Sequence, residues 1–90
     1  MTTLTAAEPA AARAAFDLAR EARRAGLRAQ LELAGRSLKG QLRHADRLGA
    51  RYVAIVGDDD ASLRDMQAGN QRVLRPHDVI PTILRGSRLA

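Results

Sequence analysis

Hydrophobic positions change their period twice in the middle of the chain. From Leu27 to Leu33 every second residue is Leu or Ala, a spacing that predicts a β-strand with one wetter face. Apolar residues then recur at helical spacing from Leu38 to Leu48, which predicts a helix that ends at Gly49. The continuous, mostly β-branched run Tyr52–Val56 is typical of a buried parallel strand. Together these segments predict a right-handed strand–helix–strand unit.

The N-terminal part of the chain predicts one helix behind a short segment. Residues 1–5 are expected to be a tail or the remnant of a strand. Thr5–Glu8 matches a capping box, in which Thr and Glu side chains bond the first free N–H groups of a helix. We therefore expect a helix from Ala10 to Ala25, ended by Gly26. Its predicted apolar stripe consists of Ala12, Ala15, Phe16, Ala19 and Ala22.

The C-terminal part predicts a hairpin followed by a helix. Two short runs, Leu63–Met66 and Arg72–Arg75, flank a turn signal, so we expect two antiparallel strands there. Asp78 is expected to cap a short helix that ends at Leu84. Residues 86–90 are then expected to be a tail.

Composition limits the class of protein. The 90 residues allow one small domain, 1–90, whose core must be aliphatic because the chain has one Phe, one Tyr and no Trp. The absence of Cys excludes disulfides and thiolate metal sites. The sequence shows no apolar run of membrane-spanning length and no signal-peptide pattern. We therefore expect a cytoplasmic protein that does not bind a membrane.

A net charge of +5 favours a polyanionic partner. Of the 15 basic residues, only Lys39 is a lysine. Arginine suits phosphate groups because it binds them through two parallel N–H bonds and releases their counterions. A GC-rich genome would impose the same excess of Ala and Arg on any protein. Composition therefore leaves nucleic-acid binding and a merely solvated basic surface equally open.

Recognised catalytic and metal-binding patterns are missing from the sequence. His44 and His77 have no cysteine to activate and no histidine one turn away with which to share a zinc ion. Asp58–Asp60 lacks the spaced ligands of a calcium loop, so we expect a solvated turn. Phosphate-loop and dinucleotide fingerprints are also absent. We expect no metal, no cofactor and no catalysis in this chain.

The central segment resembles a known family. The residues that carry the likeness are GRSLK at 35–39, Gln41, Ala45-Asp46, LGARYV at 48–53 and IVG at 55–57. They resemble the C-terminal anticodon-binding domain of histidyl-tRNA synthetase, and the likeness extends over residues 5–85. It implies an α/β fold, a three-layer sandwich of three helices and a mixed, mostly parallel sheet of order 2-1-3-4-5. It also implies a domain that holds the anticodon loop of the histidine tRNA, while the ligase reaction takes place in a separate catalytic domain.

The resemblance points to RNA contacts at the start of the central helix. Arg36 and Ser37 lie where free backbone N–H groups and the helix dipole favour an anion, and Arg36 can add a bidentate contact. The competing interpretation is that Ser37 only caps the helix and Arg36 is solvated. Lys39 lies in the same turn and can contact phosphate, whereas Arg43 lies one turn further on and is more peripheral.

A second group of contacts is implied beyond the third strand. Related synthetases read anticodon bases with an acid just after that strand and a basic residue on the next one. The matching residues are Asp60 and Arg64. A carboxylate can accept from a base amino group, and an arginine can donate to a base edge. The link from Asp60 to Leu63 is shorter than the family's usual turn.

The first strand is the main departure from the family. The family places a strongly apolar strand in the middle of the sheet, and this chain has only Met1–Thr5 there. Either Thr2–Leu4 forms a stunted strand, or the neighbouring strands pair directly, or a second chain fills the gap. That second chain would be another copy or a synthetase catalytic domain. Our alternative function is accordingly a protein-interaction or regulatory module that kept the fold but lost tRNA binding.

Overall fold

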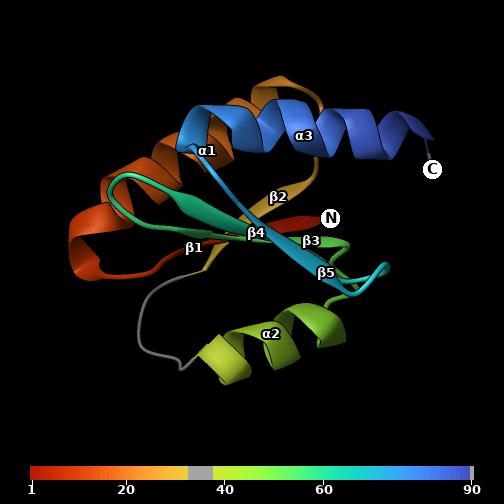
Figure 1. Cartoon of the computed structure of the whole chain (residues 1–90), viewed down its shortest axis with the longest axis horizontal. Helices are drawn as coiled ribbons and strands as arrows, with labels where there is room; N and C mark the ends of the chain where they lie inside the picture. The colour runs from red at the N-terminus through yellow and green to blue at the C-terminus, as the bar shows by residue number, and fades with distance from the viewer. Residues whose placement is uncertain (33–37, 90) are drawn as a thin grey trace.

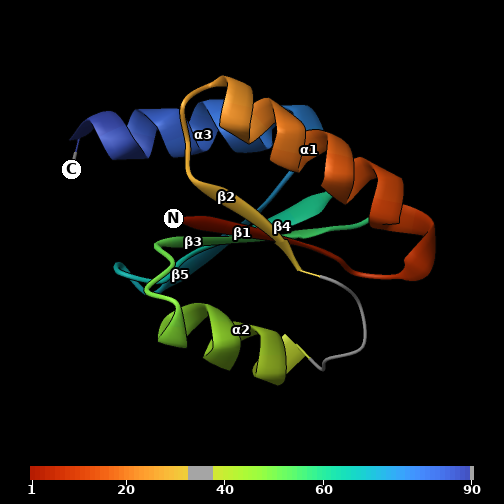
Figure 2. The same cartoon turned by 180° about the vertical axis from the view of Figure 1, so that it is seen from behind.

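The predicted strands and helices assemble into three layers (Figure 1). The computed structural model describes residues 1–32 and 38–89. The elements are β1 (Thr2–Ala6), the 3-10 turn η1 (Pro9–Ala11), α1 (Ala12–Arg24), β2 (Ala29–Glu32), α2 (Leu38–Arg47), β3 (Tyr52–Val56), β4 (Ala61–Asp65), β5 (Asn70–Leu74) and α3 (Pro76–Leu89). In these residues a five-stranded sheet of order β2-β1-β3-β4-β5 has α1 and α3 on one face and α2 on the other, as Figure 2 also shows. The expected α/β sandwich is confirmed.

The short first strand lies in the middle of the sheet. β1 runs parallel to both β2 and β3, with Leu4 opposite Leu31 on one side and Ala54 on the other. The remaining pairs, β3 with β4 and β4 with β5, are antiparallel. Threonine is β-branched and suits a strand, which explains how a Thr-rich segment serves in this position. Of the three arrangements considered for the first strand, the structure shows the short strand.

The capping box predicted at Thr5–Glu8 is wrong. Thr5 lies inside β1, where it is paired with Glu32 and Ile55. The α1 helix begins at Ala12, after the 3-10 turn, and no described side chain forms a hydrogen bond that caps its N-terminus. Threonine suits both a helix cap and a strand, and pairing with two neighbouring strands decides between them here.

Small side chains bring α1 close to the sheet. Phe16, which we placed on the apolar stripe, is 44% exposed, and Ala12 is exposed as well. The guanidinium carbon of Arg20 lies 6.0 Å from the centre of the Phe16 ring. The residues of α1 that are buried against the sheet are Ala15, Leu18, Ala19 and Ala22.

The last helix is longer than predicted. α3 continues past Leu84 to Leu89, so residues 86–89 belong to the helix and not to a tail. Asp78 lies within the first turn instead of at the cap, where its carboxylate still favours the helix dipole. None of the helices in the described ranges is long and apolar enough to cross a membrane.

Two apolar clusters hold the layers together. The larger cluster packs α1 and α3 against the sheet. Leu48, expected on the apolar side of the central helix, lies just beyond the end of α2 and is 36% exposed. In the described part of the chain, the buried members of the cluster beneath α2 are Ala45, Ala50 and Val53. Among the described residues, fewer buried apolar side chains lie beneath α2 than beneath α1 and α3.

Gly86 allows α3 to approach β3 closely. A Cβ at this position would collide with the hydroxyl group of Tyr52, a residue that is only 6% exposed. We predict that Gly86→Ala lowers the free energy of unfolding by about 1–2 kcal/mol, because overpacking outweighs the helix preference of alanine. Chemical denaturation measures this. In a Tyr52→Phe background most of the loss should disappear, and an equal loss in both backgrounds would contradict the collision.

Candidate nucleic-acid interface

Three basic side chains follow the outer side of α2. Lys39, Arg43 and Arg47 are spaced four residues apart, and all three are exposed. Residues at this spacing are neighbours on a helix, so they form one line, which we call the α2 stripe. No ion pair joins any of the three to another described residue. The α2 stripe therefore presents to solvent three positive charges that no described carboxylate pairs with.

The opposite side of α2 is fastened to the sheet. His44 Nε2 lies 3.3 Å from Glu32 Oε1, and both side chains are largely buried. Glu32 Oε1 also accepts a hydrogen bond from Gln30 Nε2 at 3.0 Å. His44 thus lies at the boundary between α2 and the sheet. Its contact ties α2 to β2 and helps to fix the direction in which the α2 stripe faces.

Arg64 faces the same side of the sheet as α2. It lies opposite Val53 on β3, and Val53 belongs to the cluster beneath α2. Directly opposite residues point to the same face of a sheet. Arg64 Nη1 donates to Gln71 Oε1 at 3.4 Å, and the buried Arg64 Nε has no hydrogen-bond partner in the described structure. The buried Nε cannot reach a ligand, but Nη2 forms no hydrogen bond with a described residue and remains a donor on this side.

Asp60 ends the tight turn between β3 and β4. Its carbonyl accepts a hydrogen bond from the Gly57 N–H at 2.8 Å. Asp58, Asp59 and Asp60 are all exposed, and residues 1–32 and 38–89 contain no group of three side chains that could hold a metal ion. Adjacent carboxylates repel phosphate groups. This turn can therefore meet RNA only through hydrogen-bond donors such as base amino groups.

The predicted site residues form an extended surface and do not converge on one point. The start of α2, which contains Lys39, and the β3–β4 turn, which contains Asp60, lie at the end of the sheet where the parallel strands finish (Figure 1). Arg64 is four residues further along β4, about 13 Å away at strand spacing. Arg36 and Ser37 lie outside the described residues. The α2-side surface, as we name it, consists of Lys39, Arg43, Arg47, Asp60, Arg64 and Gln71.

Two members of the α2-side surface were missed from the sequence. Arg47 continues the four-residue spacing of Lys39 and Arg43, so the helical period alone could have identified it. Gln71 meets Arg64 because of the register of the β4–β5 hairpin. That register depends on the length of the turn, which a poorly alternating sequence does not specify.

A separate polar cluster supports the hairpin. Arg51 Nη2 lies 3.8 Å from Asp65 Oδ2, and the Arg51 guanidinium carbon lies 5.1 Å from the centre of the Tyr52 ring. Asp65 Oδ1 accepts hydrogen bonds from the backbone N–H groups of Gln67 and Ala68 at 3.0 and 3.1 Å. These contacts hold the β4–β5 turn to the start of β3, so we assign this cluster a structural role.

Comparison with known proteins identifies the family. The family model described as an anticodon binding domain matches residues 3–85. The chain therefore belongs to the anticodon-binding domain family. Within that family its resemblance is to the histidyl-tRNA synthetases, as the sequence indicated.

The relatives found by sequence are histidine–tRNA ligases. The chain is 45% identical over 69 residues to the enzyme of Rubrobacter xylanophilus, a match that covers 71% of this chain and 16% of the relative. It is 37% identical over 90 residues to the enzyme of Syntrophotalea carbinolica, covering 94% of this chain and 22% of the relative. The chain thus spans about a fifth of the length of these relatives.

Two solved structures of aminoacyl-tRNA synthetases resemble this chain over nearly its whole length. Histidyl-tRNA synthetase from Nostoc sp. PCC 7120 matches with a TM-score of 0.85 and 26% identity, over 99% of this chain and 22% of that one. The RNA-binding domain of threonyl-tRNA synthetase from Cryptosporidium parvum matches with a TM-score of 0.77 and 16% identity, over 91% of this chain and 22% of that one. The second match shows that this chain and the threonyl-tRNA synthetase domain have the same fold.

Proposed function

We propose that this chain is a tRNA-binding module that holds the anticodon loop of the histidine tRNA. It has no catalytic activity of its own, and the ligation of histidine takes place on a separate catalytic domain. The family supports the general role. The histidine–tRNA ligases among the relatives of this chain support the choice of the histidine tRNA. The α2-side surface offers positive charges together with groups that can read bases.

The observation that carries the proposal is the α2 stripe on the side of the sheet that Arg64 faces. The three charges of the stripe contact backbone phosphates and position the anticodon loop. Arg64, supported by Gln71, donates to a base edge, and Asp60 accepts from a base amino group. Phosphate contacts and base contacts are thus separated along one side of the sheet, as recognition of a single-stranded loop requires.

The first strand bears on one reason for the alternative function. A protein-interaction module was considered because an unfilled gap in the sheet would need a strand from a partner. β1 is paired along Thr2–Thr5 with β2 and along Thr2–Ala6 with β3. The sheet of this chain therefore has a strand at its centre, and the reason for a partner strand at that position is removed.

Arg64→Ala tests the base-reading role. We predict that it weakens binding to a histidine anticodon stem-loop by about 1–3 kcal/mol and lowers the preference over a stem-loop with altered anticodon bases. Fluorescence anisotropy with both stem-loops measures this. Arg36→Ala is expected to weaken binding to the histidine stem-loop within the same range, of about 1–3 kcal/mol.

Arg75→Ala is the matched control, because Arg75 is an exposed arginine just beyond the end of β5. It should leave both affinities nearly unchanged. An equal loss for the two stem-loops would make Arg64 a phosphate contact and not a base reader. An unchanged affinity would remove Arg64 from the site.

A further inference from the structure

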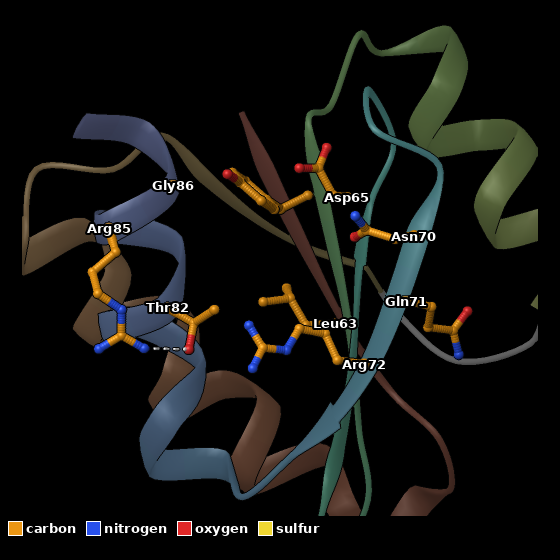
Figure 3. A pocket seen from close by; sticks show the side chains of 9 residues that line it. Leu63, Asp65, Asn70, Gln71, Arg72, Thr82, Arg85 and Gly86 are labelled. Carbon is orange, nitrogen blue, oxygen red and sulfur yellow. Dashed lines mark hydrogen bonds between the residues drawn. The ribbon is translucent and has the colours of Figure 1, made fainter. Parts of the chain in front are cut away.

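A cavity lies between the β4–β5 hairpin and α3, on the side of the sheet opposite α2 (Figure 3). The cavity has a volume of about 530 Å³. Its walls include the apolar side chain of Leu63, the ring of Tyr52 and the amide of Asn70. Arg72 from β5 and Arg85 from α3 complete it. Neither arginine belongs to the α2-side surface.

Arg72 and Arg85 reach the cavity from different elements. In Figure 3 their guanidinium groups lie on either side of Thr82, and Arg85 Nη2 donates to Thr82 Oγ1 at 3.3 Å. Neither arginine forms an ion pair with a carboxylate in the described residues. Two positive side chains that border one cavity without a paired acid attract an anion into it. The arrangement is that of a site for a negatively charged group.

The acid in the cavity wall is already engaged. Asp65 Oδ2 pairs with Arg51, and Asp65 Oδ1 accepts the backbone N–H groups of Gln67 and Ala68. These contacts hold the hairpin turn. The carboxylate is therefore not available to neutralise Arg72 or Arg85.

We infer that this cavity binds the phosphate group of a nucleotide. Two guanidinium groups can hold a phosphate through parallel N–H bonds. A nucleotide suits the volume, because ligand pockets enclose about 300–1,000 Å³. Leu63 and Tyr52 offer the base an apolar wall, and the Asn70 amide can bond a base edge. The two arginines are separate from the tRNA proposal, because Arg72 lies opposite Leu63 on the α3 side of the sheet. Gln71 borders both the cavity and the α2-side surface.

Titration of the 90-residue chain with adenosine monophosphate tests the site. We expect the amide NMR signals of Leu63, Arg72 and Thr82 to shift with adenosine monophosphate, and inorganic phosphate to compete. Adenosine at the same concentration should leave them in place. Arg72→Gln and Arg85→Gln should each weaken binding about tenfold, as expected for loss of a charge-assisted bond.

Arg75→Gln removes an exposed arginine outside the cavity and should leave the affinity unchanged. Competition with a single-stranded RNA then distinguishes two ligands, a backbone phosphate of RNA and the phosphate of a free nucleotide. Displacement of the nucleotide by RNA, with weaker RNA binding by Arg72→Gln, assigns the site to an RNA backbone phosphate. Nucleotide binding that RNA does not displace assigns it to a free nucleotide. Binding of adenosine as tight as that of the monophosphate, or full affinity in both cavity variants, would overturn the inference.

Discussion

Leu4→Ala should lower the free energy of unfolding by about 2–5 kcal/mol, the largest loss we expect from a single substitution. Leu4 is 0% exposed and belongs to the cluster between the sheet and the α1–α3 layer. β1 is paired on both sides, so its backbone cannot shift to close the cavity that alanine leaves. Small domains are stable by only about 5–15 kcal/mol. The melting temperature should therefore fall by about 10 °C or more.

Leu48→Ala makes the same chemical change at a position that is 36% exposed. It should cost about 1 kcal/mol or less, because less apolar surface is lost from the folded state. Thermal and chemical denaturation of both variants give the comparison. Equal losses at Leu4 and Leu48 would mean that the Thr-rich first strand is not the centre of the core.

Replacing Lys39, Arg43 and Arg47 together by alanine should produce the largest loss of RNA binding. Each charge that contacts a phosphate contributes about 0.7 to the salt slope for a single strand, so the slope should fall by about 2. The same relation predicts an affinity loss of about a hundredfold near 0.1 M salt. Anisotropy titrations of the histidine anticodon stem-loop at several salt concentrations measure both quantities. All three residues are exposed, so we expect the variant to fold.

A matched triple variant controls for net charge. Arg13, Arg20 and Arg24 are exposed residues of α1, on the other face of the sheet, and their replacement removes the same charge. This variant should retain most of the affinity and most of the salt slope. Equal losses for the two triple variants would show that RNA responds to total charge and not to the α2 stripe.

The central unit could be predicted from the sequence because period and composition agree there. Tyr52–Val56 was predicted with the bounds that the structure shows, since a run of mostly β-branched residues suits only a buried strand. The helix from Leu38 was predicted within one residue of its end at Arg47. The order of the strands came from the resemblance to a family, because local patterns carry no information about which strands are neighbours.

The errors fall where tertiary contacts decide between two local readings. Thr5 suits a cap as well as a strand, and only pairing with β2 and β3 selects the strand. Glycine is a poor helix former, so Gly86 indicated that the last helix had already ended. It lies inside α3 because no side chain fits between this helix and Tyr52. Phe16 has the correct helical spacing but lies at the edge of the buried stripe of α1.

The candidate site was predictable in part. The resemblance to a family pointed to Lys39 and, more peripherally, to Arg43, and the structure shows that both are exposed on α2. The family pattern identified Arg64, but its partner Gln71 depends on hairpin register. The cavity at Arg72 and Arg85 unites a strand with a helix of another layer, so no sequence pattern could reveal it.

Binding of the histidine tRNA through its anticodon is the central claim. The most direct measurement compares the affinity of the chain for histidine tRNA, for another tRNA and for duplex DNA across a range of salt concentrations. We expect histidine tRNA to bind most tightly, with a preference that persists as salt weakens all three. Equal and steeply salt-dependent binding to the three nucleic acids would contradict the claim.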